Sequence, residues 1–99
     1  MLTSDMEPNA DIRIIINPAS AAGKTLRRIP SIVQALRQAF PERLAILLTR
    51  VSGDAGLMAG DAVREGAGMV VAVGGDGTLH EVVNGMLGAT GGARPGTAL

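Results

Sequence analysis

The sequence of 99 residues contains no cysteine, tryptophan or tyrosine, and Phe40 is its single aromatic residue. Without cysteine, the chain can form neither disulfides nor metal sites with thiolate ligands. With one aromatic ring, it has no stacking platform of the kind that binds single-stranded nucleic acid. The formal net charge is zero, so the sequence also lacks the basic surface that DNA- and RNA-binding proteins present to phosphate.

Long apolar runs are absent as well. Wholly apolar stretches reach about five residues, whereas a helix that spans a bilayer needs ~20. Residues 1–10 are polar and lack the apolar segment of a signal peptide. We therefore expect them to be a flexible N-terminal segment, and we expect a cytoplasmic protein that meets any lipid from the membrane surface.

Apolar runs alternate with amphipathic stretches along the rest of the chain. The runs at 12–16, 44–49 and 69–73 predict strands, and because they are almost wholly apolar, the strands should be buried on both faces. Apolar residues at spacings of three and four predict helices. We expect these helices at 25–39, at about 54–65 and at 78–87.

This order predicts an α/β fold of three layers, in which a mostly parallel sheet carries helices on both faces. Residues 11–99 would form one such domain. Pro30 lies inside the first helix, which we expect to run through it with a distorted first half. Three parallel strands leave an exposed sheet edge, and the tail from residue 89 adds no further element, so we expect the natural protein to continue.

Open α/β sheets bind ligands beyond the carboxyl ends of their strands. Two loops lead from a strand to a helix at this edge, at 17–24 and at 74–77. Each would supply backbone N–H groups and a helix N-terminus, which together attract phosphate. The sequence therefore predicts a nucleotide phosphate site that draws on both loops.

The second loop places a carboxylate among three glycines. Gly74, Gly75 and Gly77 would let a phosphate touch the backbone, and they also permit positive φ. Asp76 would repel a phosphate unless a cation lay between them, a need that Mg²⁺ bound to ATP meets. Alternatively, Asp76 would accept the proton of an attacking hydroxyl. Both roles stay open.

The residues after this loop have simpler explanations. Thr78 and Glu81 have the spacing of a capping box, so their simplest role is to cap the third helix. His80, in the expected first turn, is either a polar surface residue or a ligand contact. Because it is the only histidine, a metal cluster built on histidines is excluded.

The first loop contains Gly23, Lys24 and Thr25, which match the end of a P-loop. That motif requires a glycine where Pro18 stands, so we exclude a true P-loop. Lys24 and Ser20 can still offer a cation and a hydroxyl to phosphate. A lysine at a helix start is unfavourable against the helix dipole, which favours a binding role for it over a simple surface charge.

Two segments resemble the diacylglycerol kinase catalytic-domain family, which includes bacterial lipid kinases and the sphingosine and ceramide kinases. They are the Ile-Asn-Pro-Ala-Ser run at 16–20 and the stretch 71–85 around Gly-Gly-Asp-Gly-Thr. That second signature is shared with NAD kinases and, in a shorter form, with phosphofructokinases. The Asn-Pro-x-Ser loop is what points to the lipid kinases.

The resemblance implies an enzyme of lipid metabolism that transfers the γ-phosphoryl group of ATP, with Mg²⁺, to a lipid hydroxyl. Asp76 would be the catalytic residue and the metal ligand. The acceptor would be a diacylglycerol or sphingoid-like lipid at a membrane surface, and a homodimer is compatible with the resemblance. The residues expected to bind nucleotide are Asn17, Pro18, Ser20, Gly23, Lys24, Gly74, Gly75, Gly77 and Thr78.

The sequence departs from the family pattern at two places. Ala21 stands where glycine is usual, and residues 54–55 replace a frequent His-Ala pair. The family also carries a second glycine-rich stretch, Gly-Thr-Gly-Asn-Asp, and a β-rich domain beyond the point that Leu99 reaches. We therefore expect residues 11–99 to be an incomplete nucleotide-binding domain that is inactive as a kinase by itself.

Two alternatives to a lipid kinase stay open. An NAD kinase-like enzyme would share the loop around Asp76 but would not need Asn17 and Pro18. A non-catalytic nucleotide-binding domain would keep the fold without phosphoryl transfer. A Rossmann-type oxidoreductase is disfavoured, because no G-x-G-x-x-G follows the first strand. The sequence does not identify the acceptor lipid.

Overall fold

The computed structural model describes residues 11–40, 44–92 and 96–99. The expected flexible segment 1–10 lies outside the described residues. Strands and helices alternate as predicted, with one short 3₁₀ helix, η2, added before the first long helix. The elements are β1 (Ile12–Ile16), η2 (Ala21–Gly23), α1 (Lys24–Ala39), β2 (Leu44–Leu48), α2 (Asp54–Arg64), β3 (Met69–Val73) and α3 (Asp76–Ala89).

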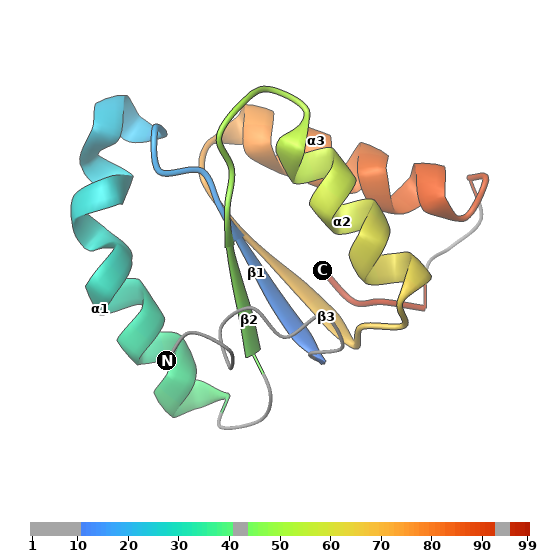
Figure 1. The fold of residues 1–99 in the computed structure, drawn as a ribbon, viewed down its shortest axis with the longest axis horizontal. Helices are drawn as coiled ribbons and strands as arrows, with labels where there is room; N and C mark the ends of the chain where they lie inside the picture. Colours follow the sequence, from blue (N-terminus) through green and yellow to red (C-terminus); the bar gives the residue numbers. More distant parts are fainter. Residues whose placement is uncertain (1–10, 41–43, 93–95) are drawn as a thin grey trace.

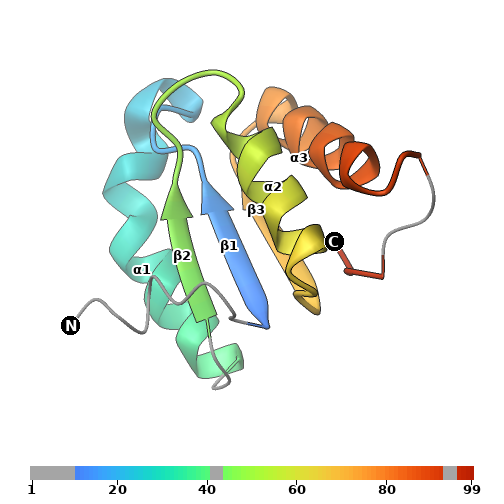
Figure 2. The same cartoon turned by 45° about the vertical axis from the view of Figure 1, so that its right-hand side comes forward.

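The three strands form a parallel sheet in the order β2-β1-β3, so β1 is central (Figure 1). Ile16, the last residue of β1, pairs with Leu48 of β2 and Val73 of β3. The three strands therefore end level with one another and deliver their loops to one edge. Helix α1 covers one face of the sheet, and α2 and α3 cover the other (Figure 2). The predicted three-layer α/β fold is confirmed.

Strand β1 is buried along its whole length and sends alternate side chains to the two faces. Ile15 joins the core beneath α2 and α3, where alanines at 55, 59 and 62 let α2 approach the sheet closely. Arg13 lies on the same face and is also buried, with Nη1 2.6 Å from Oε1 of Glu65. The core on the other face includes Ile12, Ile14, Ile16, Leu44, Ile29, Leu36 and Phe40.

Helices α2 and α3 are in backbone contact. A Cβ on Gly85 would lie 2.1 Å from the carbonyl oxygen of Gly56, and a Cβ on Gly56 would lie 3.1 Å from that of Glu81. Real Cβ contacts do not reach the first of these distances, so a side chain at Gly85 would force the two helices apart. Glycine at these positions lets the middle of α3 lie directly against the start of α2.

The structure of α1 and of the C-terminal segment can be compared with the sequence prediction. Helix α1 is a single helix that runs through Pro30, as predicted, but it is continuous α-helix over Lys24–Ala39 and lacks the distorted first half that was also predicted. Ala98 forms a parallel bridge with Met69 and so begins to cover the free edge of β3, which the sequence pattern did not reveal. Within the described ranges, no helix is both long and apolar enough to cross a bilayer.

Candidate functional site

The loops after β1 and β3 lie against each other, and Asn17 connects them. The backbone N–H of Asn17 donates to the carbonyl oxygen of Val73 at 2.9 Å. Its side-chain Nδ2 donates to Oγ1 of Thr78 at 3.3 Å, and its Oδ1 accepts from the Ala19 N–H at 3.0 Å. The two predicted loops are therefore adjacent: the Asn17 N–H and Nδ2 connect them, while Oδ1 holds the first loop in shape.

The first loop folds back on itself before α1. Ser20 Oγ donates to the carbonyl oxygen of Asn17 at 2.8 Å and shares a further hydrogen bond with the Thr25 hydroxyl. The Ser20 side chain thus supports the shape of the loop. Lys24 is the first residue of α1 and is exposed, so its ammonium group stands at the positive end of the helix in water.

Two residues of this loop adopt a conformation that favours glycine. Ala21 and Ala22 have φ values of 55° and 56°, and Gly23 follows at 85°. The left-handed region costs an L-residue roughly 1–2 kcal/mol, whereas glycine enters it freely. The geometry at Ala21 therefore explains in physical terms why glycine suits this position.

The three glycines of the second loop have different structural roles. A Cβ on Gly74 would lie 2.4 Å from Thr78 Oγ1, so Gly74 makes room for the buried threonine. Nothing lies within 4 Å of a Cβ built on Gly75 or Gly77, and both residues are exposed. All three have φ outside the left-handed region, so positive φ is not what these positions require. Gly75 and Gly77 leave bare backbone open to solvent.

Asp76 is the first residue of α3, with Gly75 as its N-cap. A carboxylate in this position is stabilised by the positive end of the helix dipole. The side chain is exposed, and no other described residue donates a hydrogen bond or an ion pair to it. It is therefore accessible to a cation or to a reacting hydroxyl, and the glycines on either side leave the approach clear.

The predicted capping box is wrong, because α3 begins at Asp76, two residues earlier than expected. Thr78 consequently lies inside the helix, and no side chain caps its N-terminus. Glu81 Oε1 instead accepts a hydrogen bond from the N–H of Gly53 at 3.1 Å. The same shift moves His80 out of the first turn, and its ring hydrogen-bonds to a side chain one turn further along α3.

A third loop, residues 49–53 after β2, reaches the same edge and was missed by the sequence analysis. Asp54 Oδ2 accepts from the backbone N–H groups of Arg50 and Val51 at 2.8 and 3.1 Å. These hydrogen bonds lower the pKa of the Asp54 carboxyl. The sequence pattern predicted only the helix that follows this loop, although the loops after all parallel strands lead to the same edge of a sheet.

A recess of about 340 Å³ lies between the three loops. Of the predicted nucleotide-binding residues, Asn17, Gly77 and Thr78 line it, together with Glu81 and residues 49–52. Pro18 lines a different, more apolar recess beside β2 and α1. The other predicted residues belong to the same two loops without lining the recess: Ser20, Gly23, Lys24, Gly74, Gly75 and Asp76.

The side chains at this edge of the sheet fit a metal ion that is bound together with a phosphate-bearing ligand. Within the part of the chain that the structure describes, no three histidine, aspartate or glutamate side chains cluster closely enough to hold a metal ion by themselves. Mg²⁺ is commonly held by one or two carboxylates while phosphates and water supply its remaining ligands. The single open carboxylate of Asp76 suits that mode of binding.

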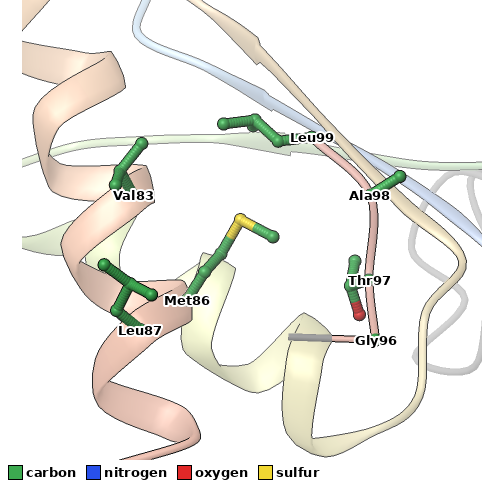
Figure 3. Close-up of a pocket in the computed structure, with 7 residues that line it drawn as sticks. All are labelled: Val83, Met86, Leu87, Gly96, Thr97, Ala98 and Leu99. Carbon is green, nitrogen blue, oxygen red and sulfur yellow. The ribbon is translucent and has the colours of Figure 1, made fainter. Parts of the chain in front are cut away.

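Another recess, of about 400 Å³, lies between the second half of α3 and residues 96–99 (Figure 3). Its walls are mainly aliphatic: Val83, Met86 and Leu87 line it from α3, and the Met86 side chain extends toward the C-terminal segment. The hydroxyl of Thr97 is engaged, because it donates to the carbonyl oxygen of Ala67 at 2.6 Å. Since this segment pairs with the start of β3, the recess lies away from the three loops and their polar groups.

Residues 11–98 match the family model for the diacylglycerol kinase catalytic domain. The chain is 42% identical over 74 residues to diacylglycerol kinases of Staphylococcus aureus and Staphylococcus haemolyticus, a match that covers 75% of this chain and 23% and 22% of those proteins. A crystal structure of a diacylglycerol kinase from Bacillus anthracis superimposes with a TM-score of 0.68 at 32% identity, over 78% of this chain and 28% of that one. The chain thus spans about a quarter of the length of these relatives.

Proposed function

This chain belongs to the diacylglycerol kinase catalytic-domain family, and from that membership we propose that it is the nucleotide-binding part of an ATP-dependent lipid kinase. The reaction is transfer of the γ-phosphoryl group of ATP to a lipid hydroxyl. The observation that supports this proposal most directly is the exposed carboxylate of Asp76 at the N-terminus of α3, flanked by the open backbone of Gly75 and Gly77.

The start of α3 suits a phosphate chain. Its first N–H groups have no partner within the helix, and the dipole adds partial positive charge, so anions bind there readily. Gly75 and Gly77 have no side chains to keep a phosphate oxygen away from these amides. Gly74, by contrast, serves the loop itself by accommodating Thr78.

The carboxylate of Asp76 would repel a phosphate chain bound over the start of α3 unless a cation lay between them. Mg²⁺, when bound with ATP, would neutralise the charge that develops on the transferred phosphoryl group. Asp76 would hold such a cation through its carboxylate, or it would accept the proton of the attacking lipid hydroxyl. Either role needs an accessible carboxylate, and that of Asp76 is exposed and without a partner among the described residues.

The recess beside α3 offers room for the rest of the nucleotide. It begins at Gly77 and Thr78 and extends to residues 49–52, so a ligand whose phosphates lie over the start of α3 can continue into it. The Asn17 side chain forms part of its wall while both of its polar atoms hold the loops. Asn17 therefore acts mainly by fixing the relative position of the two loops.

The acceptor in this proposal is a diacylglycerol or sphingoid-like lipid presented at a membrane surface, and the product is its phosphate ester. The test is phosphorylation of diacylglycerol in mixed micelles, with ATP and Mg²⁺, by the full-length protein that contains residues 11–99. Replacing Asp76 by Asn or Ala should lower kcat by about 10²–10⁴-fold, the usual effect of losing a group that assists proton or charge transfer.

Asp61→Asn is the matched control. Asp61 also carries an exposed carboxylate at a helix surface, where it pairs with Arg64, and its loss should leave activity unchanged. Full activity in both Asp76 variants would refute the role given to Asp76. Phosphorylation of NAD in place of lipid would instead identify an NAD kinase-like enzyme.

A further inference from the structure

Glu81 joins α3 to the loop that follows β2. Its Oε1 accepts the N–H of Gly53 at 3.1 Å, a contact between residues 28 positions apart in the sequence. Glu81 also lines the recess, facing residues 49–52. We propose that Glu81 is a positioning residue, which holds this loop as the wall of the nucleotide recess. The inference rests on the proposed function for the identity of the ligand.

The other hydrogen bonds of the loop do not replace this contact. Asp54 accepts the N–H groups of Arg50 and Val51, which closes the turn onto the start of α2. Thr49 donates its N–H to the carbonyl oxygen of Ile16, which fixes the loop where it leaves the sheet. Among the described residues, the bond to Glu81 is the one that ties the loop to α3, and hence to the helix that begins with Asp76.

The backbone of α3 at Glu81 is held close to α2. A Cβ on Gly56 would lie 3.1 Å from the Glu81 carbonyl oxygen, so the glycine lets Glu81 sit directly against α2. The side chain then spans only the short distance to the loop. Because the Glu81 backbone is already fixed by this contact, the cost of the hydrogen bond is the rotamer freedom of the side chain and the ordering of the loop.

The negative charge of Glu81 makes a direct contact with the phosphates unfavourable. A carboxylate in the recess repels the anionic end of a nucleotide. Its favourable contribution is therefore the hydrogen bond to Gly53, for which an oxygen acceptor is needed but not a charge. This assignment separates Glu81 from Asp76, whose carboxylate has no such partner in the ranges that the structure describes.

The test compares three substitutions in the intact protein. Glu81→Gln retains an oxygen acceptor in the same place, whereas Glu81→Ala removes it and Glu81→Met removes it while keeping the length of the side chain. Hydrogen exchange over residues 49–55 reports the loop, and the KM for ATP and kcat report the site. Asp61→Ala is the control for loss of a carboxylate from the neighbouring helix surface.

We expect exchange at the Gly53 amide to accelerate in the Ala and Met variants, with KM for ATP raised about three- to tenfold, the range that one lost hydrogen bond gives. Their kcat should change less than about twofold, because the reacting groups stay in place. The Gln variant should behave like the wild type in both measurements. Agreement between Ala and Met excludes a folding defect peculiar to one substitution.

Other outcomes would decide against the proposal. A large loss of kcat in the Gln variant would show that the charge of Glu81 acts on the reaction directly. Unchanged exchange in both the Ala and Met variants would show that the hydrogen bond does not order the loop. If exchange changes as expected while the wild type shows no affinity for ATP, the contact with the loop is supported and the proposed function is refuted.

Discussion

Replacing Gly85 with alanine tests the contact between α2 and α3, on which the position of the site's third helix depends. The new Cβ would lie 2.1 Å from the carbonyl oxygen of Gly56 and within 2.8 Å of that residue's C and Cα atoms. All three are backbone atoms, so no side-chain rotation relieves the overlap. Overpacking of this kind costs about 1–3 kcal/mol, and more where backbone must move.

Alanine also has the better helix propensity, worth about 0.8–1 kcal/mol in a helix interior, which opposes the overlap. We expect the overlap to win and Gly85→Ala to lower the free energy of unfolding by about 1–2 kcal/mol. The measurement is urea denaturation followed by circular dichroism.

Gly88 provides the control within the same helix. Nothing lies within 4 Å of a Cβ built on Gly88, and the residue is exposed. Gly88→Ala should therefore show the gain in helix propensity without the overlap and stabilise the protein by up to about 1 kcal/mol. Equal stabilisation by both substitutions would refute the close contact, because only Gly85 is predicted to force the helices apart.

Two further predictions concern the loops. Gly74→Ala should lower the midpoint of thermal unfolding, because its Cβ would overlap the Thr78 side chain. Gly77→Ala should leave that midpoint unchanged or higher but weaken ATP binding, measured by calorimetry. Equal affinity for ATP in Gly77→Ala and the wild type would contradict phosphate contact at Gly77. Backbone hydrogen bonds lower the pKa of Asp54 from its usual 3.8, so the stability that Asp54 contributes is present above about pH 4 and is lost as the pH falls through its lowered pKa. Urea denaturation between pH 5 and 2 should show this loss, and Asp54→Asn should reduce the slope; an unchanged slope would contradict it.

The fold could be predicted because its main signals are local. The residues of β1 are buried throughout, and the runs of β2 and β3 are equally apolar, so each strand is visible in the sequence without knowledge of its partners. The order of strands and helices then fixes a parallel sheet with right-handed crossovers. The same reasoning placed the loops of Asn17 and Asp76 at one edge, where the structure has them in contact.

The start of α3 was harder to predict because its signals conflict. Gly77 has low helix propensity and suggests a loop, while Thr78 and Glu81 have capping-box spacing. In the structure, packing decides the outcome. The Thr78 side chain is buried beside Gly74, and Glu81 is drawn to Gly53, so neither side chain is available to cap. Gly53 contributes only a backbone N–H to the hydrogen bond with Glu81, so no residue type in the sequence points to this contact.

Helix α3 carries three functional features whose spacing is fixed by the rigidity of the helix. Asp76 stands at its N-terminus, Glu81 reaches the loop after β2, and Gly85 lies against the backbone of α2. Any displacement of α3 would move the carboxylate of Asp76 and the wall of the recess together. A substitution at Gly85, remote from the recess, should therefore disturb nucleotide binding through the same helix, whereas one at Gly88 should not. The site is thus set by the packing of α3 as much as by the glycine-rich loop that precedes it.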